Sequence, residues 1–133
     1  MNTILSRSLT TAVAAAALAA PLAFAAPASA SHGGGTAIRN SGHCVGGGVF
    51  ELKAKHDDGR IEVEYEIDTN RAGQSWHYKL TDNGVVVASG TAKTVAPSGS
   101  FTVHRLIKNR VGKDTIRARG TFGSRSCGGT VSL

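Results

Sequence analysis

The stretch "GRIEVEYEID", residues 59–68, decides the fold class of this chain. From Ile61 to Ile67 every second residue is apolar, and the residues between and after them are acidic: Glu62, Glu64, Glu66 and Asp68. An apolar period of two is typical of a β-strand with one buried face. We interpret the acidic row as the solvent side of that strand. Carboxylates two residues apart on a strand are separated by about 7 Å, whereas a calcium ion needs six or more converging oxygen ligands.

The same alternation recurs in short segments along the rest of the chain, and turn signals separate them. The apolar sets fall within residues 50–55, 61–67, 76–80, 85–91, 101–103, 116–122 and 127–133. The breaks between them are "HDDG" (56–59), "DNG" (82–84), "APSG" (96–99) and "KNRVGKD" (108–114). Short strands at this spacing predict an all-β chain folded as a single antiparallel β-sandwich of about seven strands.

The hairpin around "HDDG" can be given a register from its apolar residues. With Lys55 opposite Arg60, Ala54 would face Ile61 and Leu52 would face Val63, so apolar side chains meet at each inward position. The Asn-Gly pair at 83–84 predicts a second tight hairpin. In that hairpin we expect Leu80 to lie opposite Val87.

The first thirty residues have the order of a secretory signal peptide. A single positive charge, Arg7, precedes an apolar run over 10–26, and the small residues 28–30 stand before Ser31. Two prolines interrupt the run, so we expect no transmembrane anchor. Cleavage is expected after Ala30, with Ala25 as the alternative. We therefore predict a secreted, extracellular protein with a signal peptide (1–30), a flexible glycine-rich lead-in (31–43) and one sandwich domain (44–133).

The chain contains two cysteines, Cys44 and Cys127, near the two ends of the predicted domain. In an exported protein an even number of cysteines indicates a disulfide. Neither cysteine has a neighbouring ligand at the spacing that a zinc site needs. The sequence therefore predicts a Cys44–Cys127 disulfide.

The strand count, the tryptophan in the third strand and the cysteines near both ends together resemble an immunoglobulin-like or fibronectin-like sandwich. The antibody disulfide joins the second and sixth strands, which is a different pairing from the one predicted for this chain. The stretches "DDGRIEVEYEIDTNRAGQSWHYKLTDNG", "APSGSFTVHR" and "GKDTIRARG" resemble a group of small secreted actinobacterial proteins of unassigned function. That resemblance implies export and the sandwich, and it implies no mechanism.

The residues that carry chemistry in other proteins do not form a recognisable catalytic pattern here. The chain has five histidines, and none is spaced two or four residues from another: His32, His43, His56, His77 and His104. No nucleophile motif such as G-x-S-x-G occurs. The glycine runs do not introduce a helix, so they are poor phosphate loops. We therefore expect no enzyme activity, no catalytic residue, no metal site and no cofactor.

The distribution of charge is the remaining functional signal. The formal net charge is +6, and between Lys93 and Arg125 Asp114 is the one acid. In an immunoglobulin-like topology, outward-facing Lys79, Arg117 and Arg119 would share the face of one sheet. This face could bind an anionic extracellular partner, such as a cell-wall polymer, or another protein. It carries no aromatic residue to stack bases, so we expect no nucleic acid partner.

These observations predict a secreted, monomeric, non-enzymatic binding or surface-associated module. Two alternatives remain open. One is a protease inhibitor that presents the loop "TVAPSG" (94–99). The other is a small-ligand carrier, as in secreted chromoprotein sandwiches.

Overall fold

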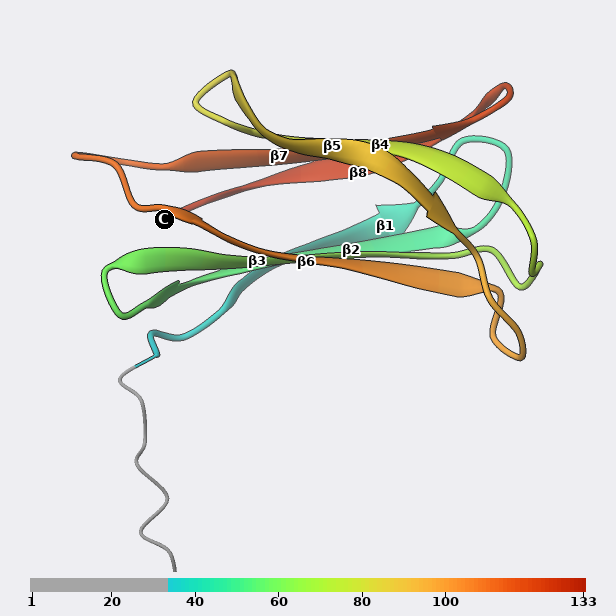
Figure 1. The fold of residues 1–133 in the computed structure, drawn as a ribbon, viewed down its shortest axis with the longest axis horizontal. Coiled ribbons are helices and arrows are strands. Elements are labelled where there is room, and N and C mark those ends of the chain that lie inside the picture. Colours follow the sequence, from blue (N-terminus) through green and yellow to red (C-terminus); the bar gives the residue numbers. More distant parts are fainter. Residues whose placement is uncertain (1–33) are drawn as a thin grey trace, which may run out of the picture.

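The computed structural model describes residues 34–133, and these residues form two antiparallel β-sheets packed face to face (Figure 1). The signal peptide and the two cleavage sites predicted from the sequence lie outside the described residues. Eight strands follow one another along the chain: β1 (Ile38–His43), β2 (Val49–Asp57), β3 (Arg60–Asp68), β4 (Ser75–Asp82), β5 (Val85–Lys93), β6 (Ser100–Lys108), β7 (Thr115–Phe122) and β8 (Arg125–Ser132). Within 34–133 there is no helix of the length and apolar character that would cross a membrane.

The strands are divided between a first sheet of order β1-β2-β3-β6 and a second sheet of order β5-β4-β7-β8. The prediction of an all-β immunoglobulin-like or fibronectin-like sandwich is confirmed. The alternation in the sequence explains the packing, because the inward-facing side chains of both sheets are buried between them. The fully buried ones include Leu52, Ile61, Tyr65, Trp76 and Ile116.

Strand β1 corrects the predicted organisation of the N-terminal part of the domain. Residues 31–43 were expected to be a flexible lead-in, but Ile38–His43 pair with β2 from Ile38↔Ala54 to His43↔Val49. The sandwich therefore has eight strands rather than about seven. The sequence of β1, "IRNSGH", has no apolar alternation, so the periodicity that revealed the other strands gave no signal here.

The register of the β2–β3 hairpin is also different from the prediction. Asp57 lies opposite Arg60 and Ala54 opposite Val63, which is a shift of two residues in the pairing. The turn consists of Asp58 and Gly59 alone, and both have positive φ angles (44° and 76°). These are the angles of the tight hairpin turn that an Asp-Gly pair favours. A two-residue shift preserves which face each side chain occupies, so the inward set was still predicted correctly.

In the β4–β5 hairpin, Asn83 and Gly84 form the expected two-residue turn, with φ angles of 47° and 84°. However, Leu80 lies opposite Ala88 rather than Val87, because the register shifts between Leu80 and Thr81. A β-bulge of this kind adds one residue to one strand. Nothing in the local sequence marks this position.

The two sheets are joined along one side by the predicted disulfide. Cys44 lies between β1 and β2, Cys127 lies in β8, and their Cα atoms are 4.4 Å apart. Beside the disulfide, Val45 and Ser126 exchange two backbone hydrogen bonds of 2.8 and 3.1 Å. The buried Tyr65 hydroxyl donates to the Cys127 carbonyl oxygen at 3.0 Å, and burial raises the Tyr65 pKa. This side of the sandwich is therefore held by covalent and polar contacts as well as by packing.

The opposite side of the sandwich, between β5 and β6, is covered by Arg105. This residue occupies an inward position of β6, and its guanidinium donates to the Tyr78 hydroxyl at 2.7 Å. It also lies 5.8 Å from the centre of the Tyr78 ring, within the range of a cation–π contact. A charged residue at an inward position of an edge strand is a common way of blocking edge-to-edge association.

Candidate anion-binding face

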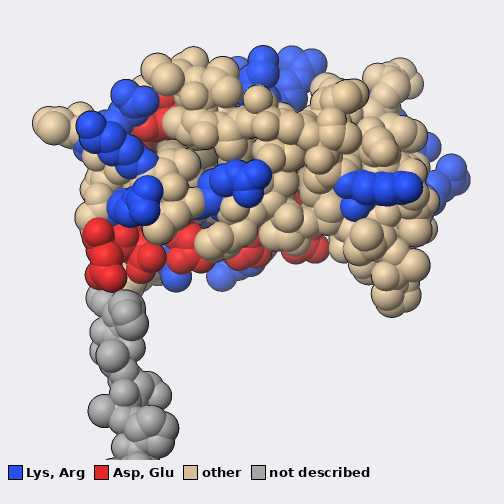
Figure 2. Space-filling model, in the orientation of Figure 1, with Lys and Arg blue, Asp and Glu red and all other residues tan. Residues whose placement is uncertain are grey.

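The two sheets present outer faces of different charge. The chain has nine Asp and Glu residues, and two of them, Asp82 and Asp114, are buried. The others lie on the first sheet and the turn between β2 and β3: Glu51, Asp57, Asp58, Glu62, Glu64, Glu66 and Asp68. Figure 2 shows most of the acidic residues gathered along the lower layer, with Lys and Arg over the upper layer and along the side in view. The outer face of β5-β4-β7-β8 therefore carries no exposed Asp or Glu side chain.

The acidic row of β3 forms ion pairs across the first sheet. Lys53 lies between two glutamates, with its Nζ 2.7 Å from Glu64 and 3.1 Å from Glu51. Glu62 accepts from Lys55 and from His104 Nε2, each at 2.9 Å. The interpretation of the row as the outer side of a strand is confirmed, and two of its four carboxylates, Glu62 and Glu64, are paired with side chains of β2 and β6.

The ion pairs change the titration of the groups that form them. The hydrogen bond from His104, followed by the one from Lys55, lowers the pKa of Glu62. The hydrogen bond to Glu64, with a second to Glu51, raises the pKa of Lys53. These groups remain partly exposed to solvent, where an ion pair contributes little to stability. The row is therefore better described as a solvated ionic ladder than as a site.

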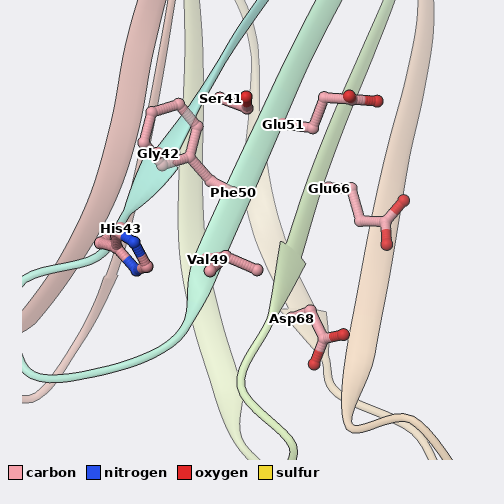
Figure 3. Close-up of a pocket in the computed structure, with 8 residues that line it drawn as sticks. All are labelled: Ser41, Gly42, His43, Val49, Phe50, Glu51, Glu66 and Asp68. Carbon is pink, nitrogen blue, oxygen red and sulfur yellow. The ribbon is translucent and has the colours of Figure 1, made fainter.

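A hollow of about 470 Å³ lies at one end of this ladder (Figure 3). Glu51, Glu66 and Asp68 project to the same side of the first sheet, while Phe50 turns to the other side. Glu66 and Asp68 take part in no ion pair among residues 34–133. Within the same residues, no three His, Cys, Asp or Glu side chains are grouped so that they could hold a metal ion. This hollow is acidic, but no second observation indicates a ligand for it.

The three basic residues predicted to form an anion-binding face are brought together on the second sheet. Lys79 of β4 is paired directly with Arg119 of β7, and Arg117 lies two residues away on the same strand. They surround a shallow groove of about 600 Å³, which we call the basic groove. Its lining is completed by polar and small residues of four segments: Thr81, Asn83, Gly84, Thr115 and Thr130.

The strand register explains the shape of the basic groove. Arg117 has a threonine on each side, Thr81 of β4 and Thr130 of β8, while Arg119 lies opposite Gly128. Because Gly128 has no side chain, the space beside Arg119 stays open. A guanidinium offers several N–H donors in a planar fork that matches a carboxylate or phosphate group. The neighbouring threonine hydroxyls can add further hydrogen bonds to the same anion.

Two features indicate that the charge of the basic groove is available to a ligand. All nine acidic residues lie in the described part of the chain, and none of them forms an ion pair with Lys79, Arg117 or Arg119. A second hollow adjoins the groove and is lined by His77, Lys79 and Arg119, among others. His77 contacts the Thr91 hydroxyl at 3.1 Å, and when it is protonated it adds a further positive charge to this face.

The loop "TVAPSG" (94–99) is held firmly at both ends. Thr94 is buried and its hydroxyl donates to the Arg71 carbonyl oxygen at 2.6 Å. Thr69 N donates to the Gly99 carbonyl oxygen at 3.0 Å. Val95 between these anchors stays 59% exposed. The loop therefore presents an apolar side chain from a fixed backbone.

The remaining residues singled out by the sequence lie apart from one another. His43 lies in β1, His56 in β2 and His104 in β6, and His32 is outside the described residues. Trp76 is fully buried, so it belongs to the core. Comparison with known proteins adds no further assignment, because no protein-family model, no curated protein and no solved structure matches the chain.

Sequence reasoning missed the pair of buried carboxyl groups behind the basic groove. Trp76, Tyr78 and Leu80 alternate as inward residues of β4, and the next inward position is Asp82. The same period therefore places Asp82 inside, although it was assigned to the turn. Its contact with Asp114 joins two segments that are 32 residues apart, and no local pattern reports such a contact.

Proposed function

We propose that the protein is a secreted, non-enzymatic binding module that holds an anionic extracellular polymer in its basic groove. The observation that carries this proposal is the grouping of Lys79, Arg117 and Arg119 on a sheet face without an exposed Asp or Glu side chain. Such a face attracts polyanions over a distance and binds them with contacts that salt weakens. The disulfide supports an oxidising, extracellular environment.

Export is part of the proposal and can be checked on secreted material. Removal of residues 1–30 would leave a mature chain that begins at Ser31, before the described domain. We expect mass spectrometry to find this chain, or one that begins at Ala26, in the culture medium. An intact first residue in the membrane fraction would contradict export.

The binding test compares two charge-reversed variants of the mature protein. Arg117→Glu with Arg119→Glu changes the basic groove, while both side chains point outward and leave the core intact. Arg60→Glu with Lys108→Glu makes the same change in net charge on the first sheet, where these two residues face each other. We expect the first variant alone to lose binding to the producer's cell wall at low salt.

The parent should release the polymer as the ionic strength rises, because exposed charges are screened over about 8–10 Å near physiological salt. Changing Glu62, Glu64 and Glu66 to Gln should leave binding unchanged or strengthen it slightly. Equal binding by the parent and both charge-reversed variants, or no binding by any of them, would refute the proposal.

The anchored loop 94–99 favours one second candidate, a protease inhibitor that presents Val95. An inhibitor of this kind needs a preorganised loop, since ordering a flexible loop on binding would reduce affinity. The candidate is tested by assaying secreted proteases with the parent and with Val95→Gly. Inhibition by the parent that is lost in the variant would support it, and the absence of inhibition would exclude it for the proteases tested.

A further inference from the structure

The carboxyl groups of Asp82 and Asp114 share one neighbour, Arg110, inside the end of the sandwich next to the basic groove. Both residues are at most 1% exposed. The backbone of Asp114 pairs with that of Leu133 through hydrogen bonds of 3.2 and 2.9 Å. Asp82 and Asp114 thus lie where the end of β4, the segment 109–114 and the residue after β8 meet.

One oxygen of each carboxyl group has a partner, and both partners belong to Arg110. Its Nε donates to Asp82 Oδ2 at 2.7 Å, and its backbone N–H donates to Asp114 Oδ2 at 3.2 Å. The other two oxygens, Asp82 Oδ1 and Asp114 Oδ1, are buried and have no hydrogen-bond partner among residues 34–133. A buried oxygen without a partner is costly, and two buried carboxylates with one neighbouring guanidinium are more costly still.

A single proton satisfies both orphaned atoms, because a protonated carboxyl oxygen donates and an ionised one accepts. We propose that Asp82 and Asp114 share one proton, and that this proton keeps the segment 109–114 closed against the end of the basic groove. Loss of the proton would place two like charges side by side in the interior. The segment 109–114 would then open, because it lies between β6 and β7 and its residues 110–113 are exposed to solvent.

The connection to the basic groove runs through Asn83, which follows Asp82 in the chain. The Asn83 side chain donates to the Lys113 carbonyl oxygen at 3.0 Å and accepts from the Thr115 N–H at 3.1 Å. Asn83 and Thr115 both line the groove. Opening of 109–114 would therefore remove the Lys113 carbonyl that helps to hold Asn83 at this end of the groove, and we expect anion binding to weaken at high pH.

The charged groups around the pair support this direction of the effect. Burial is the largest cause that raises the pKa of Asp82; the hydrogen bond from Arg110 opposes it, and the neighbouring Asp114 raises it further. Lys113 and Lys108, at the two ends of the same loop, are exposed to solvent. On the groove side lies His77, which would add a positive charge to this face when protonated and so affect anion binding for a separate reason.

The proposal is tested first on the mature protein without a ligand, by a carbon NMR titration of its aspartate side chains. We expect one carboxyl of the pair to titrate clearly above the usual range of aspartate, which is near pH 3.9. The protection of the amides in 109–115 against hydrogen exchange, relative to their intrinsic exchange rate at each pH, should fall above that titration. If both carboxyls titrate in the usual range, the shared proton is refuted, whatever the protein binds.

The matched variant is Asp114→Asn, whose amide group can donate permanently to Asp82 Oδ1. It should retain the protection of the amides in 109–115 at high pH, whereas Asp57→Asn, an equal change on the first sheet, should lose it as the parent does. If the protection of the amides in 109–115 depends on pH equally in the parent and in Asp114→Asn, the proposal is overturned. If Asp114→Asn does not fold, the titration of the parent still decides.

The effect on binding rests on the proposed function and is measured with inorganic polyphosphate and with polyglutamate as probes. At pH values above the one at which the pair loses its proton, the parent should bind each probe roughly fivefold more weakly than Asp114→Asn does. A fivefold effect is at the low end of the coupling that is typical between linked sites. Because His77 is present in both proteins, their difference reports the pair alone. A raised titration without binding of either probe at any pH would refute the proposed function and leave the shared proton standing.

Discussion

The disulfide offers a prediction whose magnitude can be calculated from the fold. Cys44 and Cys127 are 83 residues apart in the sequence, so the bond closes most of the described domain into one loop. In the chain-entropy description, closing a loop of this length lowers the conformational entropy of the unfolded chain, and this destabilises the unfolded state by about 4.6 kcal/mol at 25 °C. Replacing both cysteines by alanine should lower the free energy of unfolding by about that amount.

The native structure should change little in this double variant. The Val45–Ser126 backbone hydrogen bonds and the Tyr65–Cys127 carbonyl contact remain on either side of the lost bond. Domains of this size unfold with only about 5–15 kcal/mol, so the loss is a large fraction of the total. The melting temperature should fall by roughly 20 °C or more.

Urea unfolding followed by tryptophan fluorescence measures both quantities that the argument predicts. The midpoint should fall, and the slope of free energy against urea should rise, because an unfolded chain without the cross-link exposes more surface. The parent under reducing conditions is the control and should match the double variant. A change in stability below about 1 kcal/mol, or two titratable thiols in the folded parent, would refute the reasoning.

Three further predictions concern the core, the surface and the dependence on pH. Gly120→Ala should destabilise the domain by about 1–3 kcal/mol, since its Cβ would overlap buried Ile67 and Tyr65; a variant as stable as the parent would show that the core can adapt. The pKa of Asp82 is raised in the folded state. At pH values between the ordinary and the raised pKa, the folded protein therefore binds more protons than the unfolded chain. The free energy of unfolding should fall as the pH rises through that range. Asp114→Asn should flatten this dependence, and an unchanged slope would contradict it. Lys53→Met should alter stability by less than about 1 kcal/mol in urea, and a larger loss would mean that the ionic ladder is structural.

Much of the fold could be predicted because strand alternation is a local property of the sequence. The inward apolar set, the placement of Lys79, Arg117 and Arg119 on one sheet, and the disulfide were all correct. The register of the β2–β3 hairpin was not, since a shift of two residues leaves the buried face unchanged. There the left-handed conformation of Asp58 and Gly59 decides the pairing.

The sequence by itself determined the fold class, the cross-link and the outward direction of the basic residues, because each follows from spacing along the chain. The tertiary structure decided which of these residues share a groove and which polar groups lie behind it. Thr130 reaches Arg117 through the pairing of β7 with β8, and Asp82 meets Asp114 because two distant loops close the same end of the sandwich. Strand β1 likewise depends on the tertiary structure, because its segment has no apolar period of its own. Pairing with β2 and contact with β8 stabilise it as a strand.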